Sequence, residues 1–105
     1  MTNVEFFNLL KNVDIPWRYS KAEKGLSIPY GLYSFEREPI LLADNIVYAI
    51  ANSVSIEIYA KTKEELDSIC IQLEQIFAEN EIVWKSNESD SIDEEFFLNS
   101  YNLEV

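Results

Sequence analysis

The segment from Thr62 to Glu79 constrains the fold most, because it is the clearest helix in the chain. Thr62 is a suitable amino-terminal cap, and Glu65 stands three residues on, which predicts a capping box. An amphipathic helix buries its apolar stripe against another element, so the rest of the chain has to supply a matching surface. The residues of the stripe recur at helical spacing: Leu66, Ile69, Cys70, Leu73, Ile76 and Phe77.

Strand-like segments stand on both sides of this helix. Asn52-Ser53 is interpreted as a tight turn between two of them, although the stretch from Asn45 to Ala60 would also suit one long hairpin arm. Gly31, inside an aromatic strand, indicates a bulge or the close approach of another part of the chain. The predicted strands are Ile28–Glu36, Asn45–Ala51 and Val54–Ala60 before the helix, and Glu81–Glu88 and Phe96–Val105 after it.

A second, shorter helix is predicted over Thr2–Asn12, again with a Thr-x-x-Glu capping box. The stretch Trp17–Ser27 has no periodicity and is expected as a loop. The element order is therefore α-β-β-β-α-β-β. It predicts an α+β fold, a two-layer sandwich in which two helices pack on one face of a mainly antiparallel sheet. At 105 residues the chain is expected to form a single domain over residues 1–105.

The other face of the predicted sheet would carry Tyr30, Tyr59 and Phe96. Much aromatic surface on one small domain favours a partner that covers it.

The charge of the chain is strongly negative and unevenly distributed. There are 19 acidic and 8 basic side chains and no histidine, for a net charge of -11. Residues 1–60 hold 7 acidic and 5 basic side chains, a net of -2, whereas residues 61–105 hold 12 and 3, a net of -9. Because such a chain repels DNA phosphates, a protein that reads nucleic-acid sequence is not expected.

The composition also argues against catalysis. Without histidine there is no Ser/His/Asp or Cys/His nucleophile and no His-ligated zinc. Cys70 is the only cysteine, so it forms no internal disulfide, and its place on the apolar stripe predicts a small buried side chain. Two glycines form no phosphate-binding loop. We therefore expect no enzyme, no cofactor and no metal. The chain shows no signal peptide and no membrane span, which predicts a cytoplasmic protein.

Two polar regions are candidate surfaces. The first interleaves basic and aromatic residues, which favours docking on an acidic protein surface over binding of single-stranded nucleic acid, because the cations are few. With Arg37 it forms the candidate subunit interface: Trp17, Arg18, Tyr19, Lys21, Lys24 and Arg37. The second is acidic and lacks the spacing and turn glycine of an EF-hand, so a solvated loop is favoured over a cation site. It comprises Glu88, Asp90, Asp93, Glu94 and Glu95.

Short motifs follow one another along the chain in a characteristic order. They are Ile15-Pro16-Trp17, Pro29-Tyr30-Gly31-Leu32-Tyr33, Asp44-Asn45 with Tyr48 three residues on, Val54–Tyr59, the helix start Lys61–Leu66, and Tyr101–Val105. This order resembles the small phage and prophage proteins of the head–tail joint, the tail-terminator and tail-completion group. Gly31, where a β-branched residue is commoner, and the longer connection over residues 37–43 depart from that pattern.

The resemblance implies a structural protein that assembles as a ring, with six subunits, at the end of the tail tube or at its joint with the head. Its partners would be further copies of itself and other tail or head-completion proteins, in the bacterial host cytoplasm during assembly and then in the virion tail. A ring needs two different matching patches on each subunit, and a near-neutral half and an acidic half would suit this. The acidic residues of 88–95 would line the lumen, so that DNA passes without binding.

A second class of function fits the charge as well. Small acidic proteins, such as immunity proteins and DNA mimics, neutralise basic enzymes by electrostatic matching. A strict monomer would favour this alternative, and concentration-dependent association would favour the ring.

Overall fold

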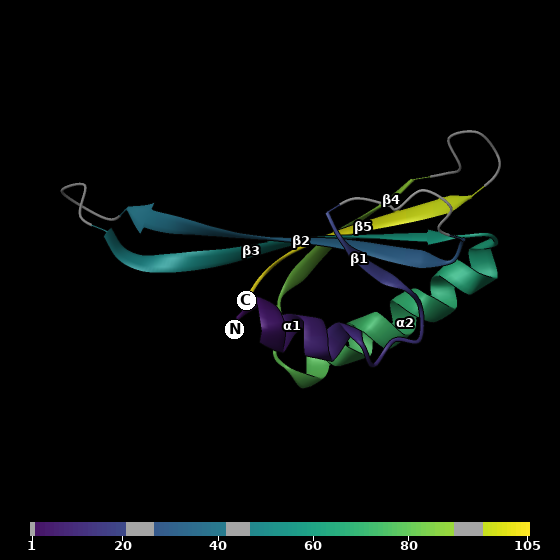
Figure 1. Ribbon diagram of the computed structural model, residues 1–105, viewed down its shortest axis with the longest axis horizontal. Helices are drawn as coiled ribbons and strands as arrows, with labels where there is room; N and C mark the ends of the chain where they lie inside the picture. The colour runs from purple at the N-terminus through teal and green to yellow at the C-terminus, as the bar shows by residue number, and fades with distance from the viewer. Residues whose placement is uncertain (1, 21–26, 42–46, 90–95) are drawn as a thin grey trace.

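The computed structural model describes residues 2–20, 27–41, 47–89 and 96–105 (Figure 1). The strands of this part of the chain form one sheet in the order β1-β2-β3-β5-β4, and both helices lie on one face of it (Figure 1). Only β1 and β2 pair in parallel, and the other described neighbours are antiparallel. The predicted α+β class and the order α-β-β-β-α-β-β are thereby confirmed. The elements are α1 (Asn3–Leu10), β1 (Trp17–Tyr19), β2 (Tyr30–Leu41), β3 (Val47–Ala60), α2 (Lys63–Glu79), β4 (Trp84–Ser89) and β5 (Phe97–Glu104).

Three strands, β1, β2 and β3, differ from the expectation. The predicted end of β2 at Glu36 is wrong, because residues 37–41, expected as part of a connection, pair with β3 and extend β2 to Leu41. β1 lies where a loop was predicted, and pairing with β2 holds it, with Trp17 opposite Gly31 and Tyr19 opposite Tyr33. The predicted turn at Asn52-Ser53 is wrong, because both residues lie inside β3 and pair with β2. The alternative of one long hairpin arm is therefore confirmed, and β1 restores the number of strands.

The helices begin at the predicted caps. At α1 the Thr2 Oγ1 accepts a hydrogen bond from the Glu5 N–H at 3.1 Å, and Glu5 Oε1 accepts from the Thr2 N–H at 3.3 Å, which completes the capping box. At α2 the Thr62 Oγ1 accepts from the Glu65 N–H at 3.1 Å. The Glu65 carboxylate, however, accepts from the N–H of Lys61 at 3.0 Å, one residue before the cap, so the capping box predicted for α2 is only half formed. Both helix starts thus satisfy amide groups that the helix itself leaves without partners.

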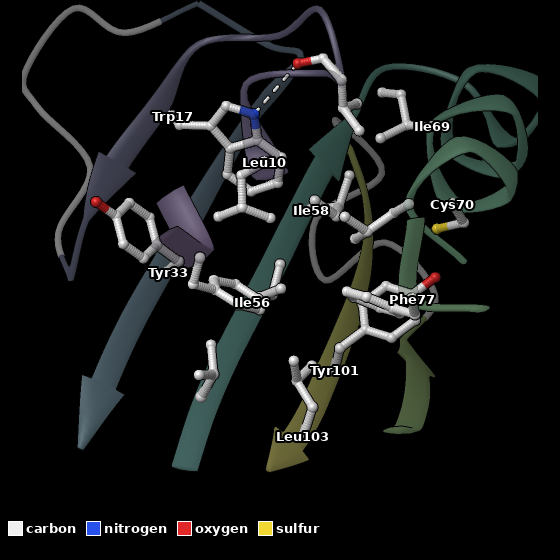
Figure 2. Close-up of a cluster of buried hydrophobic side chains, with 14 of the residues drawn as sticks. Leu10, Trp17, Tyr33, Ile56, Ile58, Ile69, Cys70, Phe77, Tyr101 and Leu103 are labelled. Carbon is white, nitrogen blue, oxygen red and sulfur yellow. Dashed lines mark hydrogen bonds between the residues drawn. The ribbon is translucent and has the colours of Figure 1, made fainter. Parts of the chain in front are cut away.

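The core lies between the sheet and the two helices (Figure 2). Alternate residues of β3 and β5 point into it, as the period of two along a strand requires. Trp17 packs directly over Gly31, where an added Cβ would stand 2.3 Å from the indole ring. The predicted close approach at Gly31 is confirmed. The largest fully buried side chains are Tyr101, Phe6, Phe77, Leu10, Ile56, Ile58, Leu66, Leu73, Val13 and Val54.

β2 and β3 extend well past the rest of the sheet (Figure 1). β5 pairs with β3 over Ser53–Ala60. In the described chain Arg37–Leu41 and Val47–Asn52 pair with each other, and beyond β5 only the carbonyl of Asn52 accepts a further bond, from the Val105 N–H. We call these two segments the arm, and the remaining sheet with its helices the body. The arm is a two-stranded ribbon that projects beyond the layer of helices.

Candidate functional site

The sheet face turned away from the helices has no second layer in the described residues, and it carries an aromatic cluster at one end. Tyr30 and Tyr59 stack with ring centroids 4.8 Å apart, and Phe96 tilts against Tyr59 at 5.4 Å. All three are half-buried. They lie on the face predicted for them. The register of β2 against β3 explains why, since Ile58 points the opposite way into the core.

The hydroxyl of Tyr59 donates a hydrogen bond to the carboxylate of Glu57, two residues away on the same strand face. Burial, followed by this hydrogen bond and the carboxylate charge, raises the pKa of Tyr59 far above its usual range. The tyrosine is therefore a neutral donor at physiological pH and supplies neither a base nor a nucleophile.

Trp17, a member of the candidate interface, belongs to the core. Its side chain is 7% exposed, and its Nε1 donates to the carbonyl of Val13 at 3.3 Å. It anchors β1 to the body and presents little surface to a partner. No local pattern indicates this role, because a tryptophan beside basic residues suits a docking strip as well as a core position.

The other described members of the candidate interface lie around the edge of β2. Arg18 stands opposite Leu32 on the open face, and its Nη1 donates to the carbonyl of Trp17 at 2.9 Å. Tyr19 is 48% exposed, and Arg37 is exposed at the base of the arm. The predictions for Lys21 and Lys24 fall outside the described residues.

Tyr19 closes the edge of β2 where β1 ends. Its hydroxyl donates to the carbonyl of Phe35 at 3.1 Å and accepts from the Phe35 N–H at 3.2 Å. A side chain thus makes the two hydrogen bonds that a further residue of β1 would make through its backbone. Sequence reasoning missed this role, because Tyr19 and Phe35 are 16 residues apart.

Two hollows flank the base of the arm. One, of about 380 Å³, is bordered by Val83, Lys85 and Glu104 among others. The other, of about 570 Å³, is lined by Thr2, Asn3, Phe35, Arg37 and Asn52. Neither lining contains the pair of carboxylates that acid–base chemistry would need.

The acidic candidate region lies almost wholly outside the described residues. Glu88 is in β4 and pairs with Asn99, while Asp90, Asp93, Glu94 and Glu95 fall beyond what the structure describes. Within the described ranges, no group of three or more cysteine, aspartate and glutamate side chains is arranged to hold a metal ion.

A buried polar cluster between α2 and β5 was not predicted. Asn99 Nδ2 donates to Cys70 Sγ at 3.2 Å, and the Tyr101 hydroxyl donates to Glu74 Oε2 at 2.7 Å. Burial raises the pKa of the Cys70 thiol, so the sulfur stays protonated and is a poor nucleophile. Figure 2 shows the thiol on α2 facing β5 from within the apolar core. The predicted buried position of Cys70 is confirmed.

No known family model matches the chain, and no curated protein matches it. Among the described residues, neither helix is long and apolar enough to cross a membrane.

Proposed function

We propose that this chain is a structural phage or prophage protein, of the tail-terminator or head–tail joining kind, that assembles as a ring and catalyses no reaction. The observation that carries the proposal is the arm. A two-stranded ribbon is marginally stable in water by itself. The sequence of this one is mostly apolar, from Pro39-Ile40-Leu41 to Val47-Tyr48-Ala49-Ile50-Ala51. Such an arm is expected to rest on another molecule of the assembly.

The surface charge supports the same proposal. A ring requires that one patch of each subunit meet a different patch of the next. The arm carries little charge, whereas the net of -9 after residue 60 belongs to the other half of the sequence. Acidic residues of 88–95 around a lumen would repel phosphates, so that DNA passes through without specific binding. The partners would be further copies of the chain and other tail or head-completion proteins.

The test is the stoichiometry of the purified protein. Light scattering and native mass spectrometry should show a closed assembly of six copies, and negative-stain images should show rings with a central hole. Open chains or a single fixed dimer at every concentration would contradict the proposal.

A second function is favoured by the outer surface of α2, where Glu64, Asp67 and Glu79 are exposed. It is that of an acidic inhibitor that binds a basic enzyme by electrostatic matching. A strict monomer that captures a basic nuclease, with an affinity that falls steeply as salt is added, would support this function and exclude the ring.

A further inference from the structure

The two long edges of the arm differ: the β2 edge is closed just before the arm begins and carries a proline within it. The N–H of Ser20 donates to the carbonyl of Tyr33 at 2.7 Å, and the Tyr19 hydroxyl then takes both backbone groups of Phe35. Alternate residues of a strand present their backbone groups to the same edge, so Pro39 falls on this edge as well. Pro39 has no N–H to offer, and proline is a common device for blocking an exposed edge.

The β3 edge of the arm has no such protection in the described residues. The N–H of Val105 donates to the carbonyl of Asn52 at 2.9 Å, so Asn52 presents its backbone groups toward β5. By alternation Ile50 presents its N–H and C=O to the same edge, past the point where β5 ends at Glu104. Val47–Ala51 contains no proline and no charge and is rich in β-formers. An edge of this kind is a template for another strand.

The charge of the arm indicates what that strand belongs to. Residues 39–51 carry one charged residue, Asp44, in a chain with 19 acidic and 8 basic side chains. Two copies of net charge -11 repel each other over most of their surface, and the arm is where they can approach with the least repulsion. A basic partner would instead be drawn to the acidic second half. The matching occupant of this edge is therefore a second copy of the chain.

The same chain also supplies a strand to donate. β4 is one of the two edge strands of the sheet, at the end opposite β1, and in the described chain nothing pairs with its far side. Leu103 pairs with Val54 and presents its N–H and C=O to β3, so the next residue back, Asn102, presents its own to β4. Lys85 of β4 pairs with Asn102 and therefore presents its backbone groups to β5. Ser86, the next residue of β4, presents its N–H and C=O outward.

We propose that the open edge of β3 in the arm pairs with the outer edge of β4 in a second copy of this chain. Main-chain hydrogen bonds would join the two sheets, as in strand addition. The contact uses two different edges, so it repeats head to tail and suits a ring. The inference therefore rests on the proposed function and adds the surface through which the subunits meet.

Proline substitutions test the pairing, because they remove one outward N–H and leave the inward ladder intact. Ile50→Pro and Ser86→Pro should each raise the dissociation constant for self-association about tenfold, the effect of one lost hydrogen bond together with an obstructed edge. Ile50→Val and Ser86→Ala keep the amide and should associate as the wild type does. Sedimentation of each variant over a concentration series measures the constants, and circular dichroism checks that the variants are folded.

A shortened arm tests the inference where a proline variant fails to fold. Replacing residues 39–50 by Asn-Gly leaves Glu38 and Ala51, which pair in the wild type, on either side of a two-residue hairpin turn. This variant should be monomeric and keep the circular dichroism of the body. Rings formed by the shortened variant would overturn the pairing and leave the proposed function standing.

The remaining outcomes separate the two proposals further. Assemblies that need both Ile50 and Ser86 but never close into a ring would support the pairing and overturn the proposed function. Dimers that depend on the arm and are unaffected by Ser86→Pro would overturn the pairing with β4. A wild-type chain that stays monomeric at every concentration would overturn both.

Discussion

β3 passes through two different environments, and the comparison of its two halves explains how this molecule is built. Over Ser53–Ala60 the strand lies between β2 and β5, with Val54, Ile56 and Ile58 fully buried under the helices. Over Val47–Ala51 it pairs with β2 alone in the described chain. The body therefore draws its stability from packing between layers, whereas the arm is held by one ladder of hydrogen bonds.

The comparison shows that the length of β2 and β3 is not set by the size of the core. The helices cover only the body (Figure 1), and β2 and β3 extend beyond the layer that could bury their side chains. A fold selected for stability alone has no need of such an extension, because an uncovered ribbon contributes little. The excess length is accordingly the part of the molecule on which assembly is proposed to depend.

The largest expected effect is on the body. Phe6 of α1 is fully buried and lies 6.4 Å from the ring of Phe35. Phe6→Ala should lower the free energy of unfolding by about 3–5 kcal/mol, because it leaves a cavity between α1 and the sheet. Val4→Ala on the same helix is the control, since Val4 is 70% exposed, and it should change the stability little. Urea denaturation measures both, and equal losses would contradict the packing described here.

A smaller effect is expected where β1 meets the body. Gly31→Ala places a Cβ against the Trp17 ring and should cost about 1–3 kcal/mol. In a Trp17→Leu background the same substitution should cost less, because the clash is with the indole. A double-mutant cycle from denaturation curves measures this coupling, and additive losses would show that the glycine is required for another reason.

The body could be predicted from the sequence because its signals are periodic. The stripe of α2 and the alternation of Val54, Ile56 and Ile58 each report burial directly, and both helix caps lie at the predicted threonines. The strand boundaries at β1 and at Asn52-Ser53 could not be predicted. Three residues are too few to show a period, and polar residues mark a turn only where no neighbouring strand pairs with them.

The polar contacts of the candidate site were beyond sequence reasoning for another reason. Asn99 and Tyr101 stand on the apolar side of β5, and that pattern signals a buried polar group. Their partners Cys70 and Glu74 are determined by how α2 lies across the sheet, which no local pattern encodes. The bond from Tyr19 to Phe35 is unpredictable in the same way, because it depends on the register of β1 against β2.

Alkaline pH should lower the free energy of unfolding through ionisable groups of the body, and the arm should not add to this loss. Burial raises the pKa of the Cys70 thiol above its usual value of 9.0, and burial with hydrogen bonding raises that of Tyr101. The folded state therefore holds these protons more tightly than the unfolded chain does. The stabilisation is complete below the pKa values of the unfolded groups, begins to fall where those groups ionise, and is lost as the pH rises through the higher pKa values of the folded state.

Urea denaturation between pH 8 and pH 11 measures this loss. Cys70→Ala should remove the part of the decline that begins near pH 9 and leave the later part, which belongs to the tyrosines. The variant with the shortened arm is the control and should follow the wild-type pH dependence. A stability that is constant up to pH 11 would show that these groups are not protected in the folded state.

The smallest effect is expected at the junction of body and arm. Tyr19→Phe keeps the edge-on ring contact with Tyr33, whose centroid is 5.1 Å away, and removes only the hydroxyl that takes both backbone groups of Phe35. Water can replace the hydroxyl at this exposed edge, so the loss should be about 0.5–1 kcal/mol. Amide exchange is the sharper measurement, because the Phe35 N–H should exchange faster while the buried ladder of Ile56 and Tyr101 keeps its protection. Unchanged exchange at Phe35 would mean that the hydroxyl does not close the edge, and the block on the β2 side of the arm would then rest on Pro39.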